Sequence, residues 1–156
     1  MSWVTSVSAK GRLRPAPVEN GCSFVATQNM TVTQLCRFPN PQSRNIEEVT
    51  IFDAHGSSIA AAHVDVLVKP NDEHGFACAA ITTSASGAAA QLRKGETYFL
   101  TMNAKCDAWH DDEHTEIEVV GGAAATVQSF YGSPPKVHVG GAGAGHCYGP
   151  LNFHFV

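Results

Sequence analysis

Charged side chains are scarce in this sequence, and long apolar runs are absent. Only 15% of the 156 residues are charged while 44% are hydrophobic, which excludes the weakly hydrophobic, highly charged composition of a disordered chain. No run of about 18 apolar residues occurs, so the sequence predicts no membrane-spanning helix. A chain of this length can bury one core, and we therefore expect a single globular domain.

Basic residues are few, and most of them are scattered. Ten Lys and Arg stand against 14 Asp and Glu, giving a net charge of −4, with one small basic group at Lys10, Arg12 and Arg14. Binding to nucleic acid needs a concentrated positive face, so no nucleic-acid partner is expected. The first residues also lack the pattern of a signal peptide. The chain is therefore either intracellular or part of a secreted parent, and its compartment stays open.

Motifs of nucleophilic and metal-dependent catalysis are missing as well. There is no nucleophile elbow, no phosphate-binding glycine loop and no HExxH pair. The cysteines Cys22, Cys36, Cys78, Cys106 and Cys147 show no CxxC spacing, so neither a zinc ribbon nor a redox dithiol is indicated. They are either free thiols or members of one or two disulfides. The sequence predicts a protein that is not an enzyme, with a small metal-dependent enzyme using histidine ligands as an alternative.

What the sequence does contain is the pattern of β-strands between closely spaced Gly and Pro residues. Apolar and polar residues alternate over short stretches rich in Val, Ile, Thr, Phe and Tyr, which is typical of strands. The clearest hairpin joins 47–53 to 58–68, and the clearest strand is 96–103. Further strands are expected at 22–27, 31–38, 75–82, 115–120, 123–131 and 151–156.

This pattern predicts an all-β fold, a two-sheet antiparallel β-sandwich of about eight or nine strands. We expect residues 21–156 to form this single domain. An irregular arm is expected over residues 1–20, because Pro15 and Pro17 block regular ladder pairing. The glycine-rich stretch 138–145 carries little side-chain information and is expected to be a loop.

Several phrases resemble, in order and spacing, a β-sandwich module appended to bacterial polysaccharide-degrading enzymes and found in other surface proteins. They occur at 32–38, at 49–53 with Gly56, at 92–100, at 106–111 and at 148–153. The resemblance implies a jelly-roll-like accessory module whose loops hold carbohydrate or a structural calcium ion. This chain has Cys36 and Cys106 where that family has glycine, which suggests that these two cysteines lie close together and form a disulfide.

The densest group of polar residues is the run 107–114, which is expected to be a loop. Closely spaced carboxylates supply the oxygen ligands that Ca²⁺ prefers, so calcium is the first cofactor candidate, with Asp107, Asp111 and Asp112 as ligands. The same run holds His110 and His114, which suit zinc or copper instead. The alternative is a solvated acidic loop that joins two strands and binds no metal.

Trp109 lies among these acids, and an exposed aromatic ring beside carboxylates such as Asp107 is the combination that grips a sugar ring. Tyr131 and Tyr148 lie near glycine-rich segments that can present their rings similarly, with burial in the core as the alternative for all of these aromatics. The sequence thus predicts a non-catalytic module that binds carbohydrate or another small polar ligand. The alternative from a different class is a structural or interaction subunit that forms a homo-oligomer through an exposed edge strand.

Overall fold

The computed structural model describes residues 1–8, 13–14, 19–39, 46–65, 72–84, 89–102, 109–110, 116–149 and 151–156. Regular structure in these ranges is almost entirely β-strand, which confirms the all-β prediction. The strands are β1 (Val4–Val7), β2 (Leu13–Arg14), β3 (Asn20–Val25), β4 (Met30–Arg37), β5 (Ile46–Asp53), β6 (Ser58–Asp65), β7 (Ala77–Ala80), β8 (Thr83–Ser84), β9 (Ala90–Leu92), β10 (Thr97–Met102), β11 (Trp109–His110), β12 (Ile117–Val119), β13 (Gln128–Tyr131), β14 (His138–Ala144) and β15 (Leu151–Phe155). A 3₁₀ helix, η2 (Val120–Thr126), lies between β12 and β13. No helix in the described ranges has the length and apolar character needed to cross a membrane.

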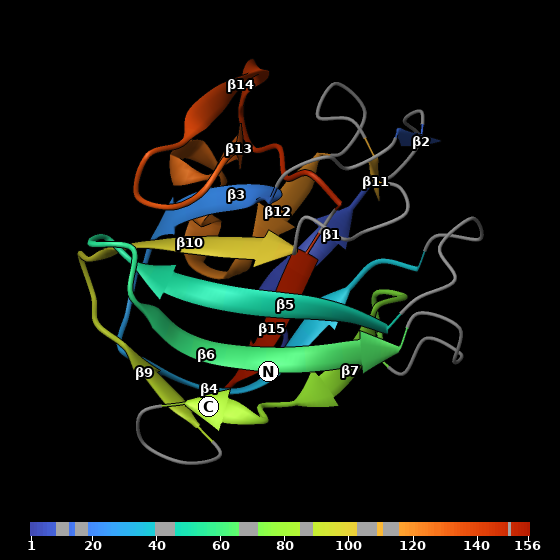
Figure 1. Ribbon diagram of the computed structural model, residues 1–156, viewed down its shortest axis with the longest axis vertical. Coiled ribbons are helices and arrows are strands. Elements are labelled where there is room, and N and C mark those ends of the chain that lie inside the picture. Colours follow the sequence, from blue (N-terminus) through green and yellow to red (C-terminus); the bar gives the residue numbers. More distant parts are fainter. Residues whose placement is uncertain are drawn as a thin grey trace.

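Two antiparallel sheets contain most of these strands. The larger sheet has seven strands in the order β14-β13-β3-β10-β5-β6-β8, and the smaller has the order β15-β4-β7 with β9 also paired to β4. Two further pairs join β1 to β12 and β2 to β11. Figure 1 shows the smaller sheet crossing behind strands β5 and β6 of the larger one.

Aromatic rings connect the inner faces of the two sheets. The ring centroid of Phe24 on β3 lies 5.6 Å from that of Phe153 on β15, and the centroid of Trp3 lies 4.7 Å from Phe24 and 4.8 Å from Phe153. All three side chains are buried. Each aromatic pair of this kind contributes about 0.5–1.5 kcal/mol beyond the burial of apolar area. The hydrophobic core therefore lies between the larger sheet and the sheet of β4, β7 and β15.

The predicted hairpin is confirmed as β5 and β6, which pair antiparallel. In the turn between them, Asp53 Oδ1 accepts the backbone N–H groups of His55 and Ser57. Gly56 completes the turn with a φ of +85°, a backbone conformation that residues with a Cβ atom rarely adopt. The sequence marks this turn correctly because its side-chain acceptor and its glycine are both local features.

The predicted central strand is confirmed as β10, which is bordered by β3 and β5. Tyr98, Leu100 and Met102, the residues expected to share one face, are all buried. Phe99 on the opposite face is also buried, because its ring packs edge-on against Phe130 of β13 with centroids 5.4 Å apart. Both faces of this strand are therefore covered.

Four expectations from the sequence differ from the structure. The expected irregular arm contains β1, which pairs with β12, and the preceding Trp3 lies in the core. The expected strand over 123–131 begins only at Gln128, because the residues before it belong to η2, in which Gly121 and Gly122 have positive φ. The expected loop over 138–145 forms β14, whose backbone pairs with β13. The strand count also differs, since many of the described strands have only two to four residues.

Candidate functional site

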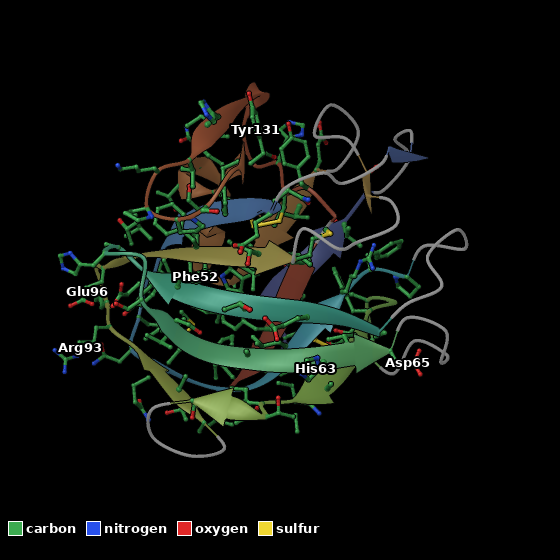
Figure 2. The ribbon with its side chains drawn as sticks, viewed as in Figure 1. Phe52, His63, Asp65, Arg93, Glu96 and Tyr131 are labelled. Atoms are coloured by element: carbon green, nitrogen blue, oxygen red, sulfur yellow. A yellow bond between two sulfur atoms is a disulfide. The ribbon has the colours of Figure 1, made fainter. Side chains whose placement is uncertain are left out.

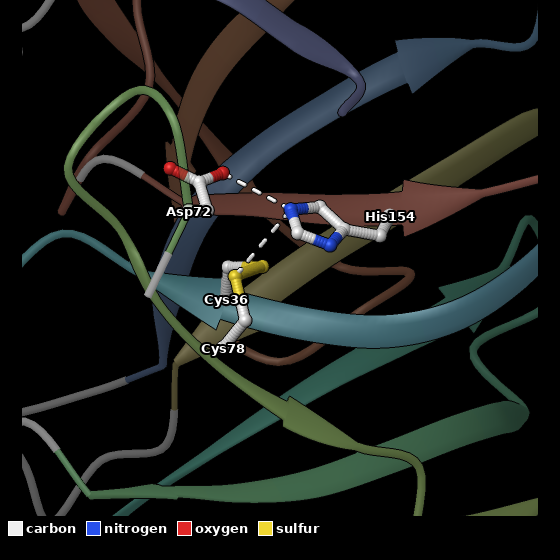
Figure 3. A group of neighbouring side chains, drawn as sticks. All are labelled: Cys36, Asp72, Cys78 and His154. Atoms are coloured by element: carbon white, nitrogen blue, oxygen red, sulfur yellow. Dashed lines mark hydrogen bonds and ion pairs between the residues drawn. A yellow bond between two sulfur atoms is a disulfide. The ribbon is translucent and has the colours of Figure 1, made fainter. Parts of the chain in front are cut away.

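A disulfide joins two neighbouring strands of the smaller sheet. Cys36 of β4 and Cys78 of β7 lie directly opposite each other, and their sulfur atoms are bonded (Figure 3). Cys36 is thus not the partner of Cys106 that the family resemblance suggested, and Cys106 itself lies outside the described residues. Strand order explains the difference, because β7 borders β4 and places the two Cα atoms 4.0 Å apart.

His154 approaches this disulfide from β15, which borders β4 on its other side. It lies opposite Gln34, two residues before Cys36 on the same face of β4. The Nε2 atom of His154 is 3.7 Å from Cys78 Sγ and 3.0 Å from Asp72 Oδ2 (Figure 3), and Nδ1 is 2.7 Å from Gln34 Oε1. Both ring nitrogens therefore have a fixed partner.

Asp72 holds the imidazole from a turn that precedes β7. Its Oδ1 accepts the backbone N–H groups of His74 and Phe76 at 2.7 and 3.0 Å, so the turn itself orients the carboxylate. Its Oδ2 accepts hydrogen bonds from His154 and from the side-chain amide of Asn152, the latter at 3.2 Å. The Asp72 side chain is only 1% exposed. Both oxygens of this buried carboxylate are therefore satisfied.

These contacts lower the pKa of Asp72. Burial alone would raise that pKa because it penalises the charged form, but hydrogen bonds from His154, Phe76 and His74 stabilise the carboxylate and outweigh burial. An ionised carboxylate only accepts hydrogen bonds, so His154 Nε2 carries a proton directed at Oδ2. The oxygen of Gln34 faces Nδ1 at 2.7 Å, so the His154 ring is held between an amide oxygen and a carboxylate oxygen.

Solvent reaches the disulfide from one side. Cys36 is fully buried, whereas Cys78 is half-buried and the side chain of His154 is 22% exposed. A thiol from solution therefore meets Cys78 first, next to the ring of His154. A protonated histidine beside a cysteine stabilises the thiolate, which is the reactive form.

The same side chains bring four metal-binding atoms together. The ligand atoms of Cys36, Asp72, Cys78 and His154 all lie within 4.8 Å of one another. Sulfur, imidazole nitrogen and carboxylate oxygen are the atom types that zinc binds in proteins. This cluster lies on a different part of the chain from the run 107–114, where a metal was expected.

Most residues of the predicted acidic site lie outside the described ranges, so the calcium and zinc or copper sites expected there stay predictions. Trp109 and His110 form β11, whose backbone pairs with Arg14 and Leu13 of β2. The predicted site residues outside the described ranges are Asp107, Asp111, Asp112 and His114.

The two tyrosines expected to contact a ligand lie in different environments. Tyr131 is 42% exposed, and its ring stacks on His138 with centroids 5.0 Å apart and an interplanar angle of 20°. Figure 2 shows Tyr131 at the end of the molecule where β13 and β14 lie. Tyr148 is buried at 7% exposure, so its ring is not presented to solvent.

Sequence patterns alone do not identify the four clustered residues as a site. No spacing motif links them, because three strands and one turn contribute one residue each. The available signal is alternation: Cys36 and His154 occupy one face of β4 and β15, while their neighbours Leu35 and Phe153 are fully buried in the core. That signal indicates a shared face of the sheet and nothing about which residues meet there.

Comparison with known proteins identifies no relative: no family model, no curated protein and no solved structure matches the chain. The resemblance to the accessory module of polysaccharide-degrading enzymes therefore rests on the sequence phrases alone. What is established is an all-β protein of antiparallel sheets with a cluster of cysteine, histidine and aspartate side chains on the smaller sheet.

Proposed function

We propose that this protein acts through a reversible thiol–disulfide centre formed by Cys36 and Cys78. The observation that carries the proposal is the position of His154, whose Nε2 lies 3.7 Å from Cys78 Sγ while Asp72 Oδ2 holds the same nitrogen at 3.0 Å. In its protonated form, His154 in this position stabilises the Cys78 thiolate. It therefore assists every exchange step in which that thiolate is formed or attacks.

The proposed reaction is exchange with a small thiol or with a cysteine of another protein. An external thiolate attacks Cys78 Sγ, a new S–S bond forms there, and the bond to Cys36 breaks to leave Cys36 as a thiolate. A second external thiolate attacks the incoming sulfur of the mixed disulfide, releases the external disulfide and leaves Cys78 as a thiolate beside His154. Two electrons pass to the cysteine pair, and the reverse sequence oxidises it again.

Thiol trapping of the folded protein tests this function. Cys106 is replaced by Ser in every sample, because a fifth thiol would form mixed disulfides. The protein is equilibrated in buffers of increasing reduced-to-oxidised dithiothreitol ratio, alkylated and analysed by peptide mass spectrometry. We expect Cys36 and Cys78 to become alkylated together under conditions in which Cys22 and Cys147 stay bonded, because the latter pair is fully buried.

The variant His154→Gln isolates the role of the imidazole. Glutamine keeps a hydrogen-bond donor on the side chain but cannot take up a proton, so reduction of the Cys36–Cys78 bond is expected to slow about tenfold. His63→Gln is the matched control, since the His63 side chain is 61% exposed on β6. The proposal fails if Cys36 and Cys78 resist reduction until the protein unfolds, or if His154→Gln and His63→Gln react at the same rate.

A carbohydrate-binding role is the second candidate, and the exposed stack of Tyr131 on His138 favours it. A flat aromatic surface of this kind supports the apolar face of a sugar ring. The jelly-roll-like arrangement and the calcium site expected from the sequence belong with this candidate. Tyr131→Ala is expected to abolish binding on a glycan array, and a parent protein that binds no glycan on the array would contradict the role.

A further inference from the structure

We propose that the reduced centre binds one zinc ion through Cys36 Sγ, Cys78 Sγ, His154 Nε2 and Asp72 Oδ2. This inference rests on the proposed function, because the two sulfurs become available to a metal only after the disulfide is reduced. The four ligand atoms already lie within 4.8 Å of one another. They belong to three paired strands and a hydrogen-bonded turn, so the protein holds most of the site before the metal arrives.

The chemistry of the four ligands selects the metal. Zinc in structural sites takes four ligands in a tetrahedron, and thiolate, imidazole and carboxylate are its usual ligands in proteins. Calcium and magnesium require mostly oxygen ligands, which two sulfurs and one nitrogen do not provide. The expected ion is therefore a softer divalent cation, with zinc as the one to test.

The separations between ligand atoms are close to the edges of a zinc tetrahedron. With Zn–N and Zn–O bonds of about 2.0 Å and Zn–S bonds of about 2.3 Å, tetrahedral angles place N and O about 3.3 Å apart and N and S about 3.5 Å apart. The observed distances are 3.0 Å from His154 Nε2 to Asp72 Oδ2 and 3.7 Å from His154 Nε2 to Cys78 Sγ. Shifts of a few tenths of an ångström therefore suffice at these edges. The two sulfurs must separate to about 3.8 Å, which reduction allows.

Two of the ligands are already oriented by neighbours that do not bind the metal. Gln34 Oε1 lies 2.7 Å from His154 Nδ1, which leaves Nε2 facing the sulfur and the carboxylate. Backbone N–H groups of His74 and Phe76 hold Oδ1 of Asp72, so that Oδ2 faces the centre. Outer contacts of this kind typically change metal affinity by about 10- to 100-fold.

Zinc and the disulfide exclude each other, because both use the same two sulfur atoms. Zinc binds the thiolate forms of both cysteines and an unprotonated Nε2, so binding releases the protons that these atoms carry in the reduced, metal-free protein. A disulfide oxidant such as oxidised glutathione forms the Cys36–Cys78 bond, is itself reduced to two thiols and releases Zn²⁺ with its charge unchanged. The centre thus has two states, one reduced and metal-bound, the other oxidised and metal-free.

Titration of the reduced Cys106→Ser protein with Zn²⁺ alone tests the inference. Alkylation of a sample first counts the reduced thiols, and elemental analysis then measures bound zinc after the reductant has been removed. We expect one equivalent of zinc in the reduced protein, and below about one-tenth of an equivalent in the oxidised protein because its thiolates are absent. Co²⁺ in place of zinc is expected to give the visible bands of tetrahedral coordination and a sulfur-to-cobalt charge-transfer band.

Two variants distinguish a ligand from a positioning residue. His154→Ala removes a ligand and is expected to lower zinc affinity about 100-fold or more, whereas Gln34→Leu removes only an outer contact and is expected to lower it about tenfold. His63→Ala is the control and is expected to bind as the parent does. If Cys36 and Cys78 are counted as reduced and the protein binds no zinc, the inference fails and the thiol–disulfide centre stands. If Cys36 and Cys78 cannot be reduced in the folded protein, both the zinc site and the thiol–disulfide centre are ruled out.

Discussion

The two disulfides in the described part of the chain differ in what surrounds them. Cys22 and Cys147 are both fully buried in the hydrophobic core and join positions 125 residues apart. Cys36 and Cys78 are 42 residues apart, and their bond lies beside the ion pair of His154 and Asp72. A longer closed loop restricts the unfolded chain more, while a buried sulfur is shielded from external thiols. The comparison indicates that one bridge stabilises the fold and that the other is placed to react.

Removing each bridge in turn is the strongest test of this difference between the two disulfides. In the chain-entropy picture, Cys22→Ala with Cys147→Ala is expected to lower the free energy of unfolding by about 5 kcal/mol, and Cys36→Ala with Cys78→Ala by about 1 kcal/mol less. Urea unfolding of both double variants at neutral pH, in the Cys106→Ser background, measures the difference. A larger loss on removing the Cys36–Cys78 bridge would contradict the division into a stabilising bridge and a reactive one.

A smaller effect is expected from Asp72, the carboxylate beside the reactive bridge. Because its folded pKa is lowered, ionised Asp72 contributes stability that is present above its usual value of 3.8 and is lost as the pH falls through the lowered folded value. Asp72→Asn is expected to reduce the free energy of unfolding by about 2 kcal/mol at neutral pH. Unfolding curves from neutral to acidic pH are expected to converge for parent and variant, and a difference independent of pH would show that the charge is not the cause.

The smallest effect is expected near the buried bridge, where Glu19 precedes the strand of Cys22. Burial raises the pKa of Glu19, the nearby Glu48 carboxylate raises it further, and Oε2 has no hydrogen-bond partner among the described residues. Ionised Glu19 therefore costs stability: the cost is absent below its usual pKa of 4.5 and develops as the pH rises through the raised folded value. Glu19→Gln is expected to add about 0.5 kcal/mol to the free energy of unfolding at neutral pH. Urea unfolding of this variant measures the change in the free energy of unfolding. A loss of stability would show that ionised Glu19 stabilises the fold, contrary to this prediction.

Short apolar stretches with alternating residues, bounded by turn residues, are sufficient to predict β10 and the β5–β6 hairpin, although both faces of β10 are buried. This pattern does not predict β14, because a glycine-rich strand has no apolar face and is identified only by its backbone pairing with β13. It also does not predict β1. The burial of Val4 and Trp3 depends on docking against β12 and β15, which lie far along the chain.

The candidate site depends on sheet order more than on spacing. Alternation assigns Cys36 and His154 to one face of their strands, but only the order β15-β4-β7 brings them to Cys78. Asp72 joins them through a turn whose shape comes from its own backbone hydrogen bonds. A single sequence shows the alternation of side chains but not the order of the strands, because strand neighbours are determined by the packing of the whole chain.

The short stretch of chain between Cys36 and Cys78 also has a consequence for oxidative refolding. The shorter loop between Cys36 and Cys78 makes their encounter more frequent in an unfolded, reduced chain than that of Cys22 with Cys147. We therefore expect the Cys36–Cys78 bridge to close first during refolding in air or glutathione, and to reopen and close again while the sheets assemble. The Cys22–Cys147 bridge would then become resistant to reductants late in refolding, when the apolar side chains around Cys22 have packed.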